Sequence, residues 1–193
     1  KCIEYTKDIF SGSSTVIHLS ASGETLTAQT ARELSKEDSL IFLSSRYEGL
    51  DQRVIDAEVD KEISIGDYVL TGGEIPSMVL FEAIIRFIDG VVSDEESVKN
   101  DSFENNLLEH PQYTRPEKNE LGEVPKTLLS GNHDQIEKWK RKYSLGKTFL
   151  RRKDLIKQYD LNQQDIDLIK EFLSDLGYES DRIAELLSII NNE

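Results

Sequence analysis

Short β-branched and apolar runs alternate with helix-forming segments in the first half of the chain, and this alternation constrains the fold most strongly. Residues 15–20 (TVIHLS) and 39–45 (SLIFLSS) are strand-like, and helix formers occupy residues 27–36 between them. Residues 67–70 (DYVL) predict a third strand, and a short helix is expected over 53–59. Strands separated by helices of this length favour a parallel α/β sheet.

The best-signalled helix spans residues 74–88. Pro76 falls in its first turn, where proline is tolerated because the N–H it lacks would have no partner there. The predicted apolar face of this helix consists of Met78, Phe81, Ile84, Ile85 and Ile88. We therefore expect this face to pack against the sheet.

The chain divides into two parts joined by a long connection. Residues 1–88 are expected to form the α/β domain, and residues 131–193 a small all-helical domain. The helices of the second domain are predicted over 132–143, 162–177 and 180–190. Residues 89–130 are polar, show no sustained hydrophobic period and hold three of the four prolines, so they predict a partly flexible inter-domain linker.

Net charge first argues against nucleic acid as a partner. The chain has 23 basic and 37 acidic residues, a net charge of −14, whereas phosphate contacts need Lys and Arg. Residues 138–153, the basic stripe, reverse this balance, because they hold eight bases and no acid. Trp139, Tyr143 and Phe149 are interleaved with these bases. The stripe fits either a phosphate-contact surface or a solvated helix face, and charge alone leaves both open.

Several classes of protein are excluded by composition and motif. The chain of 193 residues is 37% hydrophobic, which excludes wholesale disorder, and it has no apolar run of the about 18 residues that a membrane helix needs. Cys2 is the only cysteine, and no His or Cys spacing predicts a metal site. Phosphate-binding glycine loops and the serine-hydrolase elbow are absent as well.

Three local features are candidates for chemistry. Residues 64–74 (SIGDYVLTGGE) place glycines on both sides of a short β segment, where a ligand can approach bare backbone or the chain can simply turn. Residues 45–53 (SRYEGLDQR) directly follow an apolar strand. This position is typical of a ligand-binding loop, but the charged residues in the segment could equally form a surface ion-pair cluster. Arg86 and Asp101 supply an electrostatic clamp and a general base if they converge on one substrate.

Six blocks, in this order and spacing, carry a resemblance to a known family. They are SRYEGLDQRVID, SIGDYVLTGGEIP, RFIDGVV, DSFENNLLEHPQYTRPE, EVPKTLLSGNH and SLGKTFLRR. Together they resemble the bacterial tRNA (guanine-N1)-methyltransferases, from about residue 15 to beyond residue 153. The resemblance implies an α/β fold with a trefoil-knotted parallel sheet of the SPOUT type, a helical C-terminal domain, a homodimer and a cytoplasmic location.

The activity implied is methyl transfer from S-adenosylmethionine to N1 of the guanine on the 3′ side of the anticodon. The resemblance assigns cofactor binding to Leu19, Ser20, Ala21, Gly23, Ser45, Tyr47, Glu48, Ile65, Gly66, Asp67, Tyr68, Val69, Leu70, Gly72, Gly73 and Pro76. It implies that Asp101 is the general base for the guanine N1 proton and that Arg86 stabilises negative charge on guanine O6. Mg²⁺ and the bound substrate are implied to assist.

The resemblance also implies that the linker and the helical domain bind the tRNA and that the target guanine is flipped out of its base stack. The residues assigned to tRNA are Ser102, His133, Lys140, Arg141, Lys147, Arg151 and Arg152. The alternatives to an enzyme are a catalytically impaired fragment that acts only as a dimeric cofactor- and RNA-binding module, and a protein-interaction surface formed by the stripe and the helical tail.

The chain departs from the pattern it resembles in three places. Ser45 stands where the family usually has Gly, and Ala21 where it usually has Pro, so we expect weaker donor binding at both. The family carries an additional N-terminal segment with the first strand and a GGGPGM-type loop. We therefore expect this chain, which starts at Lys1, to be an N-terminally shortened member.

Overall fold

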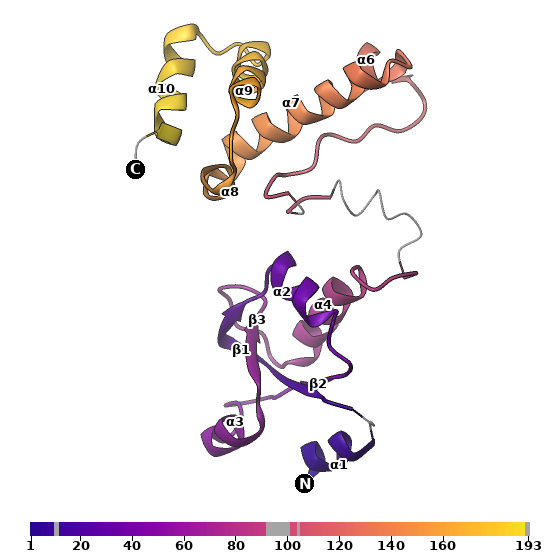
Figure 1. The fold of residues 1–193 in the computed structure, drawn as a ribbon, viewed down its shortest axis with the longest axis vertical. Coiled ribbons are helices and arrows are strands. Elements are labelled where there is room, and N and C mark those ends of the chain that lie inside the picture. The colour runs from indigo at the N-terminus through magenta and orange to yellow at the C-terminus, as the bar shows by residue number, and fades with distance from the viewer. Residues whose placement is uncertain (10–11, 92–100, 104, 192–193) are drawn as a thin grey trace. The chain divides into compact units, whose positions relative to one another are not determined.

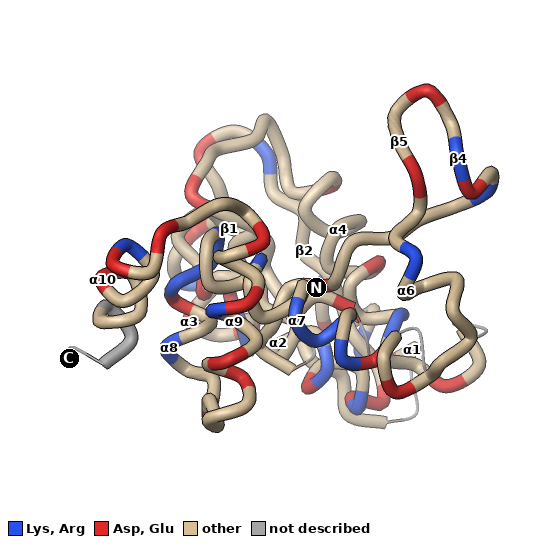
Figure 2. Tube along the Cα trace, turned by 90° about the horizontal axis from the view of Figure 1, so that it is seen from above, with Lys and Arg blue, Asp and Glu red and all other residues tan. Residues whose placement is uncertain are grey.

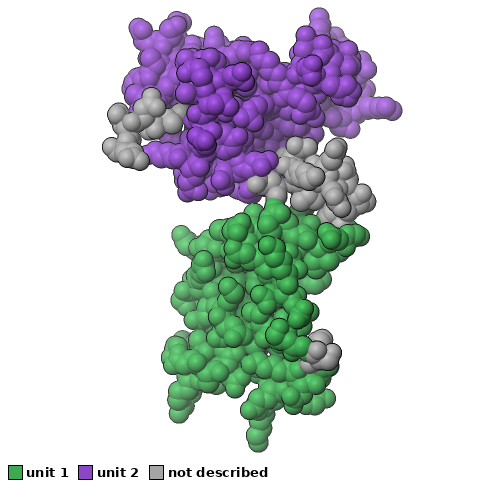
Figure 3. Space-filling model, in the orientation of Figure 1, with its two compact units in different colours: residues 1–95 green, residues 96–193 purple. Residues whose placement is uncertain are grey.

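The structure, a computed structural model, describes residues 1–9, 12–91, 101–103 and 105–191 (Figure 1). The chain forms two compact units, which are coloured separately in Figure 3. Unit 1 is Lys1–Glu95, and unit 2 is Glu96–Glu193. Each unit has a hydrophobic core of its own.

Unit 1 is built on a three-stranded sheet with the order β2-β1-β3. The strands are β1 (Thr15–Thr25), β2 (Leu40–Leu43) and β3 (Lys61–Ser64). Both neighbours pair with β1 in parallel, with Val16 opposite Ile41 and His18 opposite Glu62. The prediction of a parallel α/β sheet is therefore confirmed, and the strand expected at residues 15–20 lies at its centre.

The third strand was predicted in the wrong place. β3 is formed by Lys61–Ser64, whereas residues 67–70 lie in the loop that follows it, with Val69 84% exposed. The error has a physical cause: β3 begins with the charged pair Lys61 and Glu62, and only its last two residues, Ile63 and Ser64, are buried. A strand of four residues with two buried positions has too little apolar pattern to stand out against the apolar loop beside it.

The helices α2 (Ala28–Leu34) and α4 (Glu74–Ile85) pack on the sheet, while α1 (Cys2–Ile9) and α3 (Gln52–Glu58) complete unit 1 (Figure 1). The core is made by Ile17, Leu19, Ala31, Leu34, Ile63, Leu80 and Ile84. It joins β1 and β3 to α2 and α4. Burying these side chains is the main source of stability for a unit of this size.

The apolar face predicted for α4 is only partly correct. Ile84 is buried as predicted, but Leu80 is the other fully buried residue of the helix, and Met78 and Phe81 are 70% and 54% exposed. The helix sequence EIPSMVLFEAII is apolar on nearly every side, so its period cannot indicate which side faces the sheet. One apolar side of α4 is left uncovered in unit 1.

A bulge interrupts the pairing of β1 with β3. Leu19 and Glu24 both lie opposite Ile63, so the residues between them leave the ladder. Gly23 lies against the backbone of β3, where a Cβ atom would come within 2.5 Å of the Glu62 carbonyl carbon. The residues that follow position 20 are thus part of β1, which is bent outward by the extra residues.

Unit 2 consists of a short hairpin followed by helices. The hairpin pairs β4 (Lys118–Asn119) with β5 (Gly122–Glu123). The helices are α6 (Lys126–Leu129), α7 (His133–Arg151), α8 (Lys153–Gln158), α9 (Gln163–Asp175) and α10 (Ser180–Asn191). The core lies among α7, α8, α9 and α10, around Leu145, Ile169 and Leu173. Within the described ranges, no helix has the length and apolar character needed to cross a membrane.

Part of the predicted linker belongs to unit 2 and packs on its helices. Leu107 packs on the helical core, and the Leu108 N–H donates to Thr148 Oγ1 on α7 at 2.8 Å. The Lys147 ammonium donates to the carbonyl of Glu109 at 2.6 Å. This segment lacks a hydrophobic period because its contacts are made by single residues and by its backbone.

Candidate functional site

A pocket of about 220 Å³ lies at the carboxyl edge of the sheet in unit 1. Three segments line it: the bulge of β1, the loop after β2 and the loop after β3. In open parallel sheets, ligands bind where these loops meet, because strand ends and helix starts leave backbone groups without partners there. A ligand loop, on this ground, was one of the two predictions for the loop after β2, and a surface ion-pair cluster was the other.

The loop after β2 is fixed to the start of α4 by backbone contacts. The Gly73 N–H donates to the carbonyl of Ser45 at 2.9 Å, and Arg46 forms a β-bridge with Gly72. A Cβ atom on Gly73 would lie 2.8 Å from Ser44 Cα, which is closer than real Cβ contacts come. The pair of glycines therefore lets two loops approach more closely than any other residue would permit.

An ion pair reinforces this junction from the solvent side. Arg46 Nε donates to Glu74 Oε1 at 2.6 Å, and this hydrogen bond holds the pKa of Glu74 below its usual range. Arg53 pairs with Asp51 at 2.6 Å, so two members of the predicted surface cluster do form an ion pair. Arg46 instead pairs outside that cluster, across 28 residues of sequence.

The loop after β3 turns tightly before it reaches the glycine pair. The Tyr68 N–H donates to the Gly66 carbonyl at 2.8 Å, and the Ser64 hydroxyl donates to the same carbonyl at 3.0 Å. The ring of Tyr68 lies over Gly66, where a Cβ atom would be 2.6 Å from it. This turn directs Val69 and Leu70 to the pocket.

Tyr47 is held in an uncommon backbone conformation at the mouth of the pocket. Its φ is 61°, in the left-handed region that non-glycine residues rarely adopt, and its side chain is 98% exposed. Such strain costs of the order of 1–3 kcal/mol and is concentrated at ligand clamps. Tyr47, which the resemblance assigns to the cofactor, is thus a strained and exposed residue of the pocket wall.

The structure brings nearly all the predicted cofactor residues together. All of them except Gly23 and Asp67 line this one pocket. Gly23 instead packs against the β3 backbone below the bulge. Among the lining residues that the prediction missed are His18, Arg46 and Ser64. His18 is buried, with 3% of its surface exposed, and its position opposite Glu62 in the β1–β3 pairing places it at this edge of the sheet.

The two predicted catalytic residues lie in different units. Arg86 directly follows α4 in unit 1 and is exposed. Asp101 belongs to unit 2, is half-buried and lines a groove of about 1240 Å³. Lys138, Lys140 and Arg141 of the basic stripe line the same groove.

The basic stripe is largely neutralised by acids from elsewhere in unit 2. Arg141 pairs with buried Asp165 at 2.7 Å, and this hydrogen bond raises the pKa of Arg141. Burial opposes the charge of Lys142, but hydrogen bonds to Asp175 and Glu171 outweigh it and raise the pKa of Lys142. Figure 2 shows the basic residues of α7 and the acidic residues of α9.

The aromatic residues of the stripe belong to the packed interior. Trp139 is 8% exposed and stacks on Tyr143, and Phe149 is 2% exposed within the core. These side chains therefore pack inside unit 2 and do not form part of an exposed contact surface. Part of the stripe has a structural role. Removing the basic partner of a buried acid leaves that acid as an unpaired buried charge, which lowers the stability of the fold.

The remaining residues assigned to tRNA differ in exposure, and four of them are half-buried: Ser102, Lys140, Lys147 and Arg152. His133 begins α7 and is exposed, and Arg151 is exposed with no ion-pair partner in the described part of the chain. Arg152 pairs with Asp154 at 2.5 Å, and the Ser102 hydroxyl accepts from the Glu109 N–H at 3.0 Å. No group of three or more potential metal ligands is found among the described residues.

The fold and pocket define a ligand-binding α/β protein with the site at the carboxyl edge of a parallel sheet. The chain belongs to the tRNA (guanine-1)-methyltransferase family: the family described as "tRNA (Guanine-1)-methyltransferase TrmD" matches residues 2–158.

Curated relatives agree with this membership. The chain is 49% identical over 166 residues to the tRNA (guanine-N(1)-)-methyltransferase of Dictyoglomus turgidum, covering 86% of this chain and 67% of the relative. The enzyme of Fervidobacterium nodosum is 50% identical over 179 residues, covering 91% and 72%. That of Vibrio cholerae is 44% identical over 177 residues, covering 92% and 72%.

The close approach at Gly73 yields a prediction about stability. The substitution Gly73→Ala places a methyl group against the Ser44 backbone. We expect this substitution to lower the free energy of unfolding, measured by urea titration, by about 1–3 kcal/mol. Gly12→Ala is the matched control, because its Cβ would lie 3.7 Å from Asp38 Oδ2, an ordinary contact. Equal stability of the two variants would contradict the close approach.

Proposed function

We propose that this chain is an S-adenosylmethionine-dependent enzyme that methylates N1 of the guanine on the 3′ side of the tRNA anticodon. Its membership of the family supports the reaction class. The observation that carries the proposal is that residues assigned to the cofactor, although spread from Leu19 to Pro76, line one pocket. The proposal includes the trefoil knot of the SPOUT type and a cytoplasmic location.

The pocket fits the cofactor chemically. Leu19, Val69 and Leu70 supply apolar wall, and the glycines of the two loops supply bare backbone that a flat adenosine group can approach. Glu48 adds a carboxylate, which suits a ligand that carries positive charge. When bound, S-adenosylmethionine supplies an electrophilic methyl group.

The residues of the chain supply the proton chemistry. Guanine N1 carries a proton and is a poor nucleophile until it loses it, so a base is required. Asp101 takes this proton, and Arg86 stabilises the negative charge that develops on guanine O6. An ordinary carboxylate is a weak base at neutral pH, so the stabilisation by Arg86 is an essential part of the step. Mg²⁺ is included in the proposal as an assisting ion.

The uncovered apolar side of α4 supports the homodimer. Ile75, Met78 and Phe81 are each more than half exposed on one helix. A contiguous apolar surface of this kind is typical of a protein interface. In the proposed dimer, α4 packs on the partner, and the active site is completed by residues of both subunits.

The tRNA is proposed to bind unit 2. The groove that holds Asp101 is lined by Lys138 and Lys140, and Arg151 presents an exposed charge at the end of α7. Because Lys138 and Lys140 pair with Glu171 and Glu137, as most of the basic stripe pairs within unit 2, the proposed phosphate contact falls mainly on the exposed Arg151.

The role of Asp101 gives the direct test of the function. With tritiated S-adenosylmethionine and a tRNA that has guanine 3′ of the anticodon, Asp101→Asn is expected to slow methyl transfer about 100-fold or more, because the base is lost. Binding of the tRNA is expected to persist. Asp181→Asn, an exposed acid on α10, is the control. Full activity of Asp101→Asn would refute the proposed base, and a wild type that binds but transfers nothing would favour the binding module.

The tRNA contact is tested through salt dependence. Arg151→Ala is expected to weaken tRNA binding and to reduce the slope of log K against log salt by about 0.7–0.9, the value for one lost phosphate contact. The matched control is Arg182→Ala, because Arg182 pairs with Glu185 on α10. An unchanged slope in Arg151→Ala would remove this residue from the interface.

The dimer is tested on α4. Placing a charge in an apolar interface is costly, so Phe81→Glu is expected to raise the dimer dissociation constant at least about tenfold in sedimentation experiments. Glu82→Gln, on an exposed side of the same helix, is expected to leave it unchanged. A dimer that Phe81→Glu does not weaken would place the interface elsewhere.

A further inference from the structure

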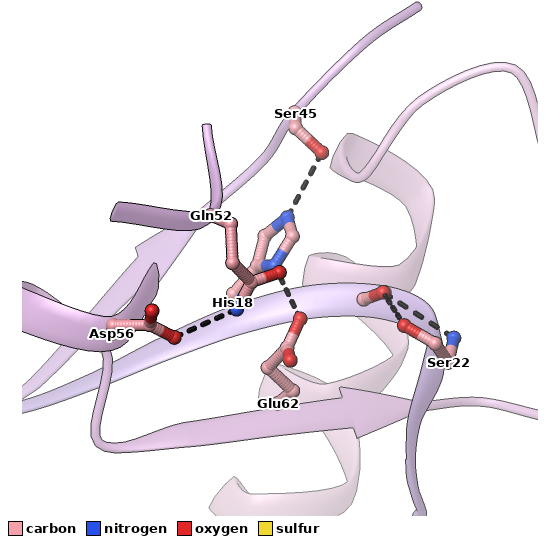
Figure 4. Close-up of polar contacts among 7 residues, drawn as sticks. His18, Ser22, Ser45, Gln52, Asp56 and Glu62 are labelled. Atoms are coloured by element: carbon pink, nitrogen blue, oxygen red, sulfur yellow. Dashed lines mark hydrogen bonds and ion pairs between the residues drawn. The ribbon is translucent and has the colours of Figure 1, made fainter. Parts of the chain in front are cut away.

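Three side chains form a continuous hydrogen-bonded chain at the edge of the pocket. His18 is 3% exposed, and its Nδ1 lies 2.9 Å from Glu62 Oε1 while its Nε2 lies 3.0 Å from Ser45 Oγ. Figure 4 shows the imidazole between the two partners. The three residues come from β1, from β3 and from the loop after β2, so the sheet itself holds them in place.

For a neutral imidazole and an ionised carboxylate, the chemistry of the three groups sets the direction of these hydrogen bonds. A carboxylate can only accept, so Nδ1 of His18 carries the proton that Glu62 receives. In the neutral imidazole, Nε2 is then an acceptor, and the Ser45 hydroxyl donates its single hydrogen to it. The lone pairs of Ser45 Oγ remain available. Ser45 therefore presents a fixed acceptor rather than a freely rotating hydroxyl.

This acceptor lies in the wall of the cofactor pocket, which both Ser45 and His18 line. We propose that Ser45 Oγ accepts a hydrogen bond from an N–H or O–H group of S-adenosylmethionine and that His18, held by Glu62, is a positioning residue. The inference rests on the proposed function. This inference reverses the expectation that Ser45 weakens binding of the methyl donor, because the Ser45 hydroxyl becomes a specific contact to the cofactor.

The same order of groups occurs in serine hydrolases, where the serine is a nucleophile. A nucleophilic serine needs neighbouring N–H donors that stabilise an oxyanion. The N–H of Gly73 already donates to the carbonyl of Ser45 at 2.9 Å and so is not available for that task. The proposal accordingly gives Ser45 a binding role.

Calorimetric titration with S-adenosylmethionine tests the acceptor. Ser45→Ala is expected to raise the dissociation constant about tenfold, the effect of losing one well-aligned hydrogen bond. Ser39→Ala is the matched control, because Ser39 directly precedes β2 whereas Ser45 lies two residues beyond its end, and the Ser39 hydroxyl lies 2.6 Å from that of Ser14. His18→Gln is expected to weaken binding as well, with thermal unfolding measured for each variant to verify that it is folded.

The ligand group is identified with cofactor analogues that each lack one donor: a ribose hydroxyl, the adenine amino hydrogens or the methionine ammonium. For the analogue that lacks the relevant donor, Ser45→Ala is expected to have no effect on affinity. If every analogue loses affinity equally in Ser45→Ala, the hydroxyl acts through packing, and the inference is overturned. Equal affinity of wild type and Ser45→Ala for the cofactor overturns it too, while leaving the proposed function intact.

Nitrogen-15 NMR of the imidazole provides a readout independent of the cofactor. We expect His18 to carry its proton on Nδ1 with Nε2 unprotonated, and Ser45→Ala to shift the Nε2 resonance while leaving Nδ1 nearly unchanged. A proton on Nε2 would contradict the assigned direction. A wild type that fails to bind S-adenosylmethionine refutes the proposed function, and with it this inference, whereas the NMR result still reports on the hydrogen-bonded chain.

Discussion

The close approach of bare backbone at Gly73 is the constraint on which the pocket depends. The loop after β2 and the start of α4 are within van der Waals distance there, and a single Cβ atom would separate them. The hydrogen bond from Gly73 to Ser45 and the ion pair between Arg46 and Glu74 then fix the relative position of the two loops. The alignment of Ser45 with His18 follows from that position.

The fold of unit 1 was largely predictable because its apolar segments have clear periods. Residues 15–20 gave the central strand and the alternation gave a parallel sheet, both confirmed by the structure. The errors arose where burial is decided by partners distant in sequence. β3 has only two buried residues, and α4 is apolar on nearly all sides, so neither pattern shows which residues the rest of the unit covers.

The candidate site was predictable mainly from the resemblance, since no single glycine pair identifies a cofactor. The basic stripe shows why charge patterns in sequence can mislead: Arg141 and Lys142 find their acids 24 and 29 to 33 residues further along the chain. Such pairs are invisible until α7 and α9 are packed. His18 shows the reverse case, because an ordinary strand residue gains chemical meaning only from its neighbours in the sheet.

The central claim is that the pocket at the carboxyl edge of unit 1 holds the methyl donor. The most direct measurement is NMR of the protein with S-adenosylmethionine labelled with carbon-13 in its methyl group. We predict nuclear Overhauser contacts from the bound cofactor to the bulge of β1, the loop after β2 and the loop ending at Gly73. Contacts confined to residues of Glu96–Glu193, or no binding at millimolar concentration, would contradict the account.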